Sequence, residues 1–332
     1  MTELVSAGVI GLGAGIPDKI VTNADMEKIV DTSDEWIRTR TGIKERRIAP
    51  PEIATSDLAL MAAENALADA GLAASDLDMI IVATITSDMV WPSTACLLQA
   101  RLGAKKAAAF DLSAGCSGFI YGVSQACQAI ATGSCRHVLV VGADVLSRIT
   151  DWTDRGTCVL FGDGAGAAVL GPVKPGAGFV AHYLGADGEG ALHLYMPAGG
   201  SRRPASAESV AGREHYVKMS GNEVFKFAVK IMPEAAEEVL RRAGLTKDEI
   251  DIFLPHQANI RIIESAAKRL EIPMERVFVN VDRYGNTSAA SIPIGLTELY
   301  KSGRLSPGMK LLLVGFGAGL TWGADVLVWT KS

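Results

Sequence analysis

Cys116 has the surroundings that most favour chemistry in this sequence. It lies in the segment FDLSAGCSGFIYGV, residues 110–123, between a predicted strand at residues 107–112 and a predicted helix at residues 119–131. Unpaired N–H groups and the dipole at the start of a helix favour a thiolate. We therefore expect a lowered thiol pKa and a nucleophilic sulfur, although most cysteines in apolar chains are inert core residues.

Two further polar side chains follow predicted strands. His256 comes directly after a predicted buried strand at residues 251–254. Ligands bind at the carboxyl ends of strands in open α/β sheets, which favours a functional imidazole here over a merely structural one. Asn286 follows a predicted strand at residues 276–281. By spacing alone, an ordinary Gly-Asn turn explains Asn286 as well as a chemical role does.

Two glycine-rich segments are weaker candidates for ligand binding. Residues 315–322, GFGAGLTW, could present backbone N–H groups to an anion, but no Gly-Lys-Ser/Thr follows and a phosphate loop is excluded. Residues 11–15, GLGAG, resemble a dinucleotide fingerprint in which the third glycine is misplaced. Pro17 and Asp18 follow where a helix would have to continue, which argues against a Rossmann site.

The elements that position these residues occur twice along the chain. An Ala-Gly-Leu helix stop ends at Leu72 and again at Leu245, and an apolar strand ends at Gly142 and again at Gly315. Both pairs are 173 residues apart. Each helix stop is followed by a short, almost continuously apolar run, as in a strand that is buried on both faces.

We therefore predict an α/β fold of two similar halves related by a pseudo-twofold repeat. Residues 1–174 form the half that carries the cysteine, and residues 175–332 form the half that carries the histidine and the asparagine. Within this scheme we expect a helix at residues 229–245 and a loop at residues 188–210.

Composition excludes several classes of protein. The 332 residues are 48% hydrophobic and carry a net charge of −5 without a basic stripe, so no nucleic-acid partner is expected. Neither a signal peptide nor a membrane span is predicted. The five cysteines form no CxxC pair, which favours a reducing cytoplasm over a disulfide framework or a zinc site. We assign three of the five to the core: Cys96, Cys127 and Cys158.

Eight segments together resemble the β-ketoacyl-[acyl-carrier-protein] synthase III family of thiolase-like condensing enzymes. The resemblance extends from about residue 5 to residue 330, and each motif is weak alone. The motifs are TNAD at 22–25, DTSDEWI at 31–37, RTGIKER at 40–46, TDRGT at 153–157, FGDGAGAA at 161–168, GNEVFK at 221–226, PHQAN at 255–259 and GNTSAAS at 285–291. The resemblance implies the layered α-β-α-β-α thiolase-like fold.

The resemblance also implies a Cys–His–Asn triad of Cys116, His256 and Asn286. In this family the thiolate takes an acyl group from acyl-CoA, and decarboxylation of malonyl-carrier protein supplies the attacking carbanion. The backbone N–H groups of Cys116 and Ala318 would form the oxyanion hole, although the family often has glycine at the position of Ala318. The resemblance further implies that a coenzyme A thioester is a substrate and that no metal or cofactor is required.

The resemblance assigns further residues to binding roles. Coenzyme A would contact Thr32, Trp36, Arg40, Arg155, Gly221, Phe225 and Asn259, with Trp36 and Arg155 sandwiching the adenine. The acyl pocket would be formed by Trp91, Leu146, Phe161 and Phe316. Trp91 would reach the end of the pocket from the partner subunit of a homodimer. Because its bulky ring would shorten the pocket, we expect short primers such as acetyl-CoA. A basic patch for the carrier protein would consist of Lys226, Arg261, Lys268 and Arg269.

Two alternatives remain open at this stage. A synthase III-like enzyme of specialised metabolism would keep the triad and use another acceptor. A non-catalytic acyl-CoA-binding homologue would need a broken triad, whereas this triad is complete in sequence. Thiolase and hydroxymethylglutaryl-CoA synthase fit less well, because they use different acid–base partners.

Overall fold

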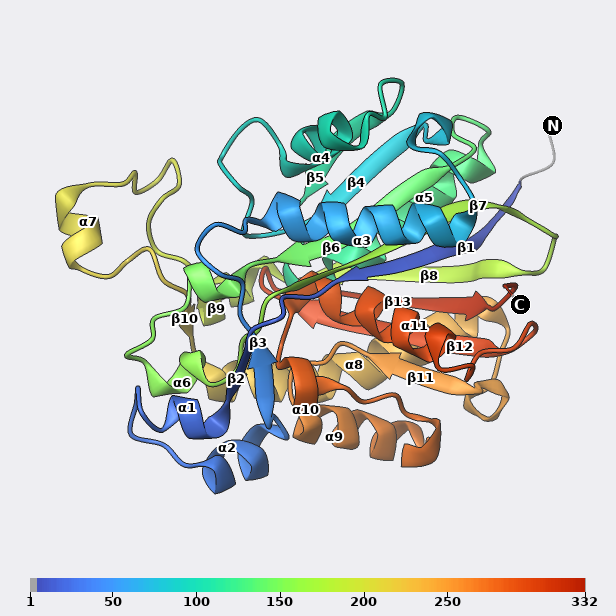
Figure 1. The fold of residues 1–332 in the computed structure, drawn as a ribbon. Coiled ribbons are helices and arrows are strands. Elements are labelled where there is room, and N and C mark those ends of the chain that lie inside the picture. The colour runs from blue at the N-terminus through green and yellow to red at the C-terminus, as the bar shows by residue number, and fades with distance from the viewer. Residues whose placement is uncertain (1–4, 332) are drawn as a thin grey trace.

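Two stacked β-sheets form the centre of the molecule (Figure 1). The structure is a computed structural model, and it describes residues 5–331. In spatial order, the first sheet contains β1 (Ser6–Gly15), β7 (Gly164–Val173), β6 (Val138–Asp144), β4 (Met79–Ala83) and β5 (Ala108–Leu112). The second sheet contains β8 (Gly178–Ala186), β13 (Thr321–Val328), β12 (Lys310–Gly317) and β11 (Ile252–Pro255).

The two sheets share one pattern of strand pairing. β4 is parallel to β6, whereas β7 is antiparallel to both β6 and β1. In the second sheet β11 is parallel to β12, and β13 is antiparallel to both β12 and β8. β4 begins at Met79 and β11 begins at Ile252, which again are 173 residues apart. The internal repeat is therefore confirmed, while a boundary at residues 174–175, in the loop between β7 and β8, stays a prediction.

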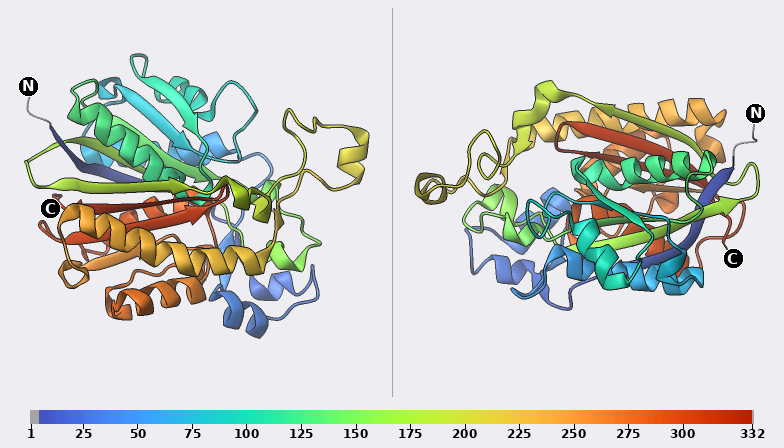
Figure 2. Two further views of the ribbon diagram at one scale, coloured as in Figure 1. Left: turned by 180° about the vertical axis from the view of Figure 1, so that it is seen from behind. Right: turned by 90° about the horizontal axis from the view of Figure 1, so that it is seen from above.

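Helices cover and separate the sheets in five layers. α3 (Thr55–Ala70) and α4 (Thr94–Leu102) pack on the first sheet, and α8 (Gly221–Ala243) packs on the second with α9 (Ile260–Leu270) beside it. α5 (Gly118–Ala131) and α11 (Ser291–Lys301) lie between the two sheets, since each contacts strands of both. The view from behind shows α8 running along the outer face of the second sheet (Figure 2). The predicted α-β-α-β-α layering is confirmed.

The remaining elements are short. They are β2 (Ile20–Thr22), β3 (Glu45–Arg47), β9 (Leu194–Tyr195), β10 (Lys218–Met219), α1 (Asn23–Met26), α2 (Asp34–Thr41), α6 (Arg155–Cys158), α7 (Ala207–Ala211) and α10 (Val281–Tyr284). The segment that carries α7 projects from the body of the molecule (Figure 1). Three of the 3-10 turns matter for the site: η2 (Gly115–Ser117), η4 (Gly188–His193) and η7 (Ser288–Ala290).

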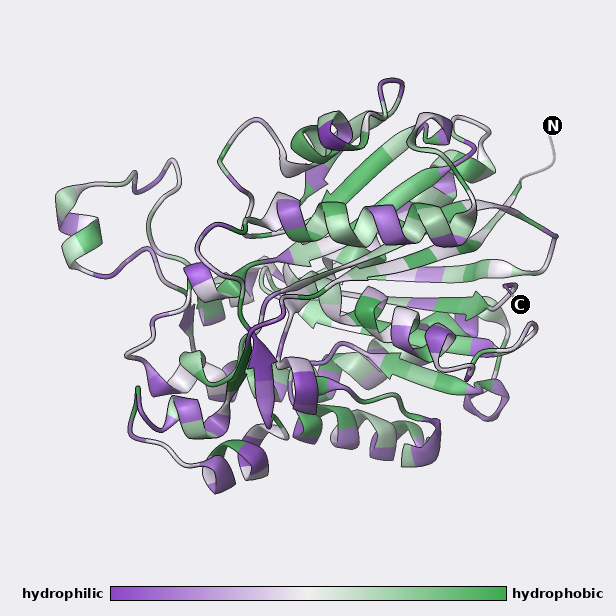
Figure 3. Ribbon diagram, viewed as in Figure 1, coloured by the Kyte–Doolittle hydropathy of each residue, from purple (hydrophilic) through white to green (hydrophobic). Residues whose placement is uncertain are grey.

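Glycine stops and apolar strands produce the repeat. α3 ends at Gly71 with φ +65° and α8 ends at Gly244 with φ +67°, a left-handed conformation that glycine adopts without steric cost. β4, β6 and β12 are almost wholly buried, and the sheet strands are correspondingly apolar (Figure 3). The central core lies between the sheets, around α5 and α11.

Some sequence predictions were wrong. The strand expected at residues 276–281 is reduced to a single bridge between Phe253 and Val277. The segment 188–210, expected to be loop, contains η4, β9 and part of α7. Cys96, assigned to the core, is exposed, because it lies on the outer side of α4. Within residues 5–331, no helix combines the length and apolar character that crossing a membrane requires.

Candidate active site

Cys116 lies in η2, between the end of β5 and the start of α5, as its sequence context predicted. Two backbone segments approach each other closely at this point. A Cβ added to Gly317 would lie 2.4 Å from the Cys116 nitrogen, and one added to Gly115 would lie 2.8 Å from the Ala318 nitrogen. Gly115 also has φ +52°, so both glycines are required by the geometry. The amides of Cys116 and Ala318 thus come from adjoining segments.

The expected lowering of the thiol pKa was wrong. Burial raises the pKa of Cys116 to about 12, with the Ser288 hydroxyl opposing the rise and the Asp144 carboxylate adding to it. The physical reason is that the desolvation penalty of a buried thiolate exceeds the electrostatic stabilisation that the start of α5 provides. At neutral pH, Cys116 is therefore a thiol.

His256 is buried at the end of β11, and its ring is neutral. Burial lowers the pKa of His256 to about 3, so the imidazole carries no charge at neutral pH. Its Nδ1 lies 2.7 Å from the Ser291 hydroxyl oxygen, and its ring packs edge-on against Phe316 with 5.5 Å between centroids. When Ser291 donates to Nδ1, the single ring proton resides on Nε2.

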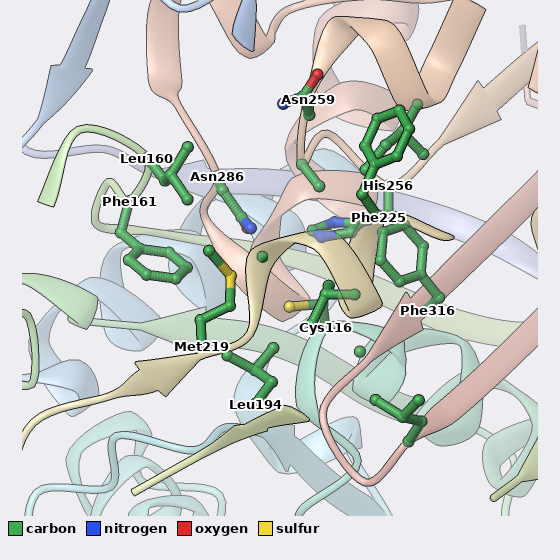
Figure 4. Close-up of a pocket in the computed structure, with 16 residues that line it drawn as sticks. Cys116, Leu160, Phe161, Leu194, Met219, Phe225, His256, Asn259, Asn286 and Phe316 are labelled. Carbon is green, nitrogen blue, oxygen red and sulfur yellow. The ribbon is translucent and has the colours of Figure 1, made fainter. Parts of the chain in front are cut away.

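Asn286 is fixed through both its backbone and its side chain. Its N–H donates to the Leu160 carbonyl (2.8 Å), and its carbonyl accepts from the Gly162 N–H (3.0 Å). Its side-chain Oδ1 accepts a hydrogen bond from the Ser288 N–H (2.8 Å). With Oδ1 occupied, the amide nitrogen remains to donate, and it points toward Cys116 (Figure 4).

The three predicted triad residues line one cavity of about 100 Å³, which we call the His-side cavity. Three residues predicted to contact coenzyme A line it as well: Gly221, Phe225 and Asn259. Figure 4 shows Cys116, His256 and Asn286 around the space that these residues enclose. The sequence prediction of a thiol, an imidazole and a carboxamide at one site thus matches the observed placement.

A second cavity, of about 170 Å³, opens on the other side of Cys116, and we call it the Ser-side cavity. Its lining is almost wholly apolar, and Ser288 and Tyr195 are the lining residues that carry a hydroxyl. Leu146 and Phe161 line it as predicted, but Phe316 lies in the His-side cavity instead because it packs on His256.

Trp91, also predicted for the acyl pocket, is 81% exposed and lines neither cavity of its own chain. It follows the exposed residues Met89 and Val90, so a contiguous apolar loop faces outward here.

The residues predicted to hold the nucleotide of coenzyme A are brought together on the surface. The Arg155 guanidinium lies 4.9 Å from the Trp36 ring centroid, and that of Arg40 lies 5.8 Å from it. An adenine between two flat groups needs about 7 Å, so Arg155 occupies the place predicted for the base. The Thr32 hydroxyl is buried and has no hydrogen-bond partner within residues 5–331.

The predicted basic patch is exposed on α8 and α9. The Arg261 guanidinium lies 5.1 Å from the ring of Phe225, beside the His-side cavity. Acidic neighbours offset part of the patch: Lys226 pairs with Glu223 (2.8 Å), and Arg269 pairs with Glu234 (3.5 Å). Lys268 is the fourth member.

The sequence prediction missed residues on both sides of the sulfur. Ser288 and Ser291 lie within the GNTSAAS motif, so a signal for them was present. Leu194, Tyr195, Met196 and Val217 line the Ser-side cavity and come from the segment that was expected to be loop and from just after it. Their polar and glycine-rich surroundings gave no signal of a packed wall.

Comparison with known proteins gives one consistent family. The family model for 3-oxoacyl-[acyl-carrier-protein] synthase III matches residues 110–188, and the model for its C-terminal part matches residues 240–329. The beta-ketoacyl-[acyl-carrier-protein] synthase III of Caldanaerobacter subterraneus subsp. tengcongensis is 60% identical over all of both chains.

Solved structures agree. The synthase III of Thermus thermophilus superposes with a TM-score of 0.91 at 51% identity, covering 98% of this chain and all of that chain. A priming β-ketosynthase from a polyketide biosynthetic pathway superposes equally well, at 0.91, but is 36% identical, covering 99% of this chain and 98% of its own. The chain therefore belongs to the β-ketoacyl-[acyl-carrier-protein] synthase III family.

Proposed function

We propose that this enzyme carries out the first condensation of fatty-acid synthesis. A short acyl group passes from acyl-CoA to Cys116 and is then joined to malonyl-carrier protein, giving 3-oxoacyl-carrier protein, coenzyme A and CO2. The observation that carries the proposal is the position of Cys116, where a cavity with His256 and Asn286 meets a second, apolar cavity. One cavity suits the pantetheine arm, and the other suits the acyl chain.

In the first half-reaction, the Cys116 sulfur attacks the thioester carbonyl. The oxygen becomes an anion, which the N–H groups of Cys116 and Ala318 would stabilise. Their close approach at Gly115 and Gly317 supports this assignment. The acyl chain then lies in the Ser-side cavity, along Leu146 and Phe161, and coenzyme A leaves.

In the second half-reaction, loss of CO2 from the malonyl group generates the carbanion, so no strong base, metal or redox cofactor is needed. The thioester carbonyl of that group becomes an enolate and requires hydrogen-bond donors. His256, neutral because it is buried, can donate from Nε2, and Asn286 can donate from its amide nitrogen. Both donors would act without a change in charge.

Coenzyme A would extend from Cys116 past Phe225 and Asn259 to the surface at Trp36. The Asn259 side chain donates to the Arg40 carbonyl (3.0 Å), which ties this route to the nucleotide end. For the adenine to stack on Trp36, Arg155 would have to swing off the ring and close over the base. Thr32 would then gain a polar partner for its buried hydroxyl.

We infer that the active unit is a homodimer. β5 is an edge strand of its sheet, and its Phe110 is 39% exposed near the apolar loop that carries Trp91. Pairing of two copies along this edge would bury both features. A Trp91 side chain contributed by the partner would close the Ser-side cavity, which favours acetyl-CoA and similarly short primers.

The basic patch of Lys226, Arg261, Lys268 and Arg269 would steer the acidic carrier protein toward the His-side cavity. The odd number of cysteines, without CxxC pairs, supports a reducing compartment, the cytoplasm. No nucleic-acid or membrane partner enters the scheme.

A second candidate is the priming condensation of specialised metabolism, favoured by the fold shared with the polyketide ketosynthase. Identity separates the two candidates, because the Caldanaerobacter synthase III is 60% identical to this chain and the polyketide enzyme is 36% identical. A preference for an acceptor other than malonyl-carrier protein would identify the second candidate.

The test is a two-step labelling experiment. Radiolabelled acetyl-CoA should label the wild type, and malonyl-carrier protein should chase the label into 3-oxobutyryl-carrier protein. Cys116→Ala should acquire no label, whereas Cys96→Ala, at an exposed thiol, should behave as the wild type does. Condensation of acetyl-CoA by Cys116→Ala would refute the proposal, and use of decanoyl-CoA as readily as acetyl-CoA would refute the short-primer assignment.

A further inference from the structure

A buried carboxylate close to Cys116 has one oxygen fully used and one free. Asp144 ends β6, and its Oδ1 accepts hydrogen bonds from the Thr84 hydroxyl (3.0 Å), the Ile85 N–H (2.9 Å) and the Thr86 hydroxyl (2.8 Å). Its Oδ2 is buried and has no hydrogen-bond partner among the described residues. Buried carboxylate oxygens without a partner are rare, and such a group calls for a functional explanation.

Ser288 lies between this carboxylate and the sulfur. It begins η7, which packs on both β6 and η2. Its hydroxyl is buried without a partner in full hydrogen-bonding geometry, yet it is near enough to lower the pKa of Asp144 and of Cys116. Ser288 and Cys116 line the same cavity. Ser288 has φ +51°, a left-handed conformation that is strained for a non-glycine residue.

We propose that Ser288 and Asp144 form a proton relay that takes the proton of Cys116 during acyl loading and returns it after condensation. The relay rests on the proposed function, because it acts on the same sulfur. It needs only a small rotation of the Ser288 hydroxyl, which would then accept from the thiol and donate to Asp144 Oδ2.

The steps balance. During loading the S–H bond breaks, its proton passes to Ser288 Oγ, and the proton of Ser288 passes to Asp144 Oδ2. The thiolate attacks the thioester, the carbon–sulfur bond to coenzyme A breaks, and coenzyme A takes a proton from water. During condensation the carbanion attacks the acyl carbon and expels the Cys116 thiolate. Asp144 then returns its proton to sulfur through Ser288, so one proton from solvent is consumed per cycle.

Asp144 is better suited than His256 to hold this proton. Burial lowers the pKa of His256 to about 3, so a charged imidazole is disfavoured. Burial raises the pKa of Asp144, which favours its protonated form. The groups that act on the Asp144 pKa from the surrounding segments are the Ile85 N–H and the hydroxyls of Thr84, Thr86 and Ser288, none of which is charged. Proton uptake there therefore breaks no ion pair with these groups.

The experiment compares three variants in single-turnover acylation by radiolabelled acetyl-CoA between pH 6 and pH 9. Ser288→Ala and Ser288→Gly both remove the hydroxyl, but glycine relaxes the left-handed backbone. Asp144→Asn keeps an acceptor at Oδ1 for Thr84 and Thr86 and cannot take up a proton. All three should acylate about 100-fold more slowly than the wild type at pH 7. Their rates should rise about tenfold per pH unit, because only the ionised thiol reacts.

Two results with the Ser288 variants would overturn the relay. One is wild-type acylation by both Ser288 variants. The other is a defect in Ser288→Ala that Ser288→Gly restores, which would assign Ser288 a backbone role alone. A slow Asp144→Asn variant with the pH profile of the wild type would equally exclude proton uptake at Asp144. Failure of the proposed function looks different, since the wild type itself would then acquire no label at Cys116.

Discussion

Burial is the largest cause of opposite pKa shifts on the two candidate reactive groups of the site. It raises the pKa of Cys116 to about 12 and lowers that of His256 to about 3. The pair is therefore a neutral thiol and a neutral imidazole, not a thiolate–imidazolium pair. A neutral donor suits enolate stabilisation, while the thiol has to lose its proton as it attacks.

The neutral His256 makes folding stability depend on pH. Unfolding restores the ordinary pKa of 6.5 for this imidazole. Between pH 6.5 and about pH 3 the unfolded chain therefore binds a proton at His256 that the folded chain does not bind, and this difference favours unfolding. This one group should remove about 2 kcal/mol of stability between pH 7 and pH 5. In urea unfolding at the two pH values, His256→Gln should lose correspondingly less stability than the wild type. The same change at the half-buried His137 is the control, and equal losses in wild type and His256→Gln would contradict the expectation.

Sequence reasoning identified candidate reactive residues where chemistry and position coincide. Cys116 and His256 follow strands, so both were predicted from the residues, whereas Asn286 needed the family resemblance because a Gly-Asn turn explains it equally well. Asp144 and Ser288 were missed. Their significance lies in a buried oxygen without a partner on each, and that property exists only once β6 and η7 have packed together.

At the scale of elements, the site depends on how closely β12 approaches η2. Gly317 ends β12, and an added Cβ there would lie 2.4 Å from the Cys116 nitrogen. Gly317→Ala should therefore displace the nucleophile and slow acylation about 100-fold, since a shift of about 1 Å costs that much.

The matched control for Gly317→Ala is Gly188→Ala. An added Cβ at Gly188 meets no atom within 4 Å, so this variant should acylate at the wild-type rate. Acylation by quench-flow measures both variants, and a fully active Gly317→Ala would contradict the geometry.

Elements with strong local signals were predicted well. α3 and α8 both end just before a glycine with positive φ, although α8 begins at Gly221 and not at residue 229 as expected, and β4, β6 and β12 are largely apolar. The strand expected at residues 276–281 was wrong because only Val277 pairs with its neighbour, Phe253. Apolar residues are needed there for packing, and the sequence does not distinguish packing from pairing.

At the scale of the whole molecule, the site requires both halves of the repeat. Cys116 comes from the first half, whereas His256 and Asn286 come from the second. The 173-residue repeat identified the halves from sequence. How they face one another could not be predicted, because that depends on the packing of α5 and α11 between the two sheets.

The exposed Trp91 provides a test at the scale of the dimer. If the partner's copy closes the Ser-side cavity, Trp91→Ala should raise the rate with octanoyl-CoA relative to acetyl-CoA more than about tenfold. Removing the large ring leaves apolar space in which the longer acyl chain can be buried, and such burial is worth several kcal/mol. Steady-state rates with the two primers measure the ratio. Met274→Ala, at an exposed apolar residue on a distant turn, should leave the ratio unchanged. An unchanged ratio in a Trp91→Ala protein that remains dimeric would exclude the role of Trp91.

The two cavities that meet at the sulfur have a consequence for the order in which the substrates bind. On the proposed route, an acyl chain held in the Ser-side cavity would leave the His-side cavity, through which it entered, free again. The same cavity must then admit the arm of the second substrate. Because both substrates would use this one cavity, they should compete for the unacylated enzyme. An excess of malonyl-carrier protein should therefore inhibit acylation until a higher concentration of acyl-CoA displaces it.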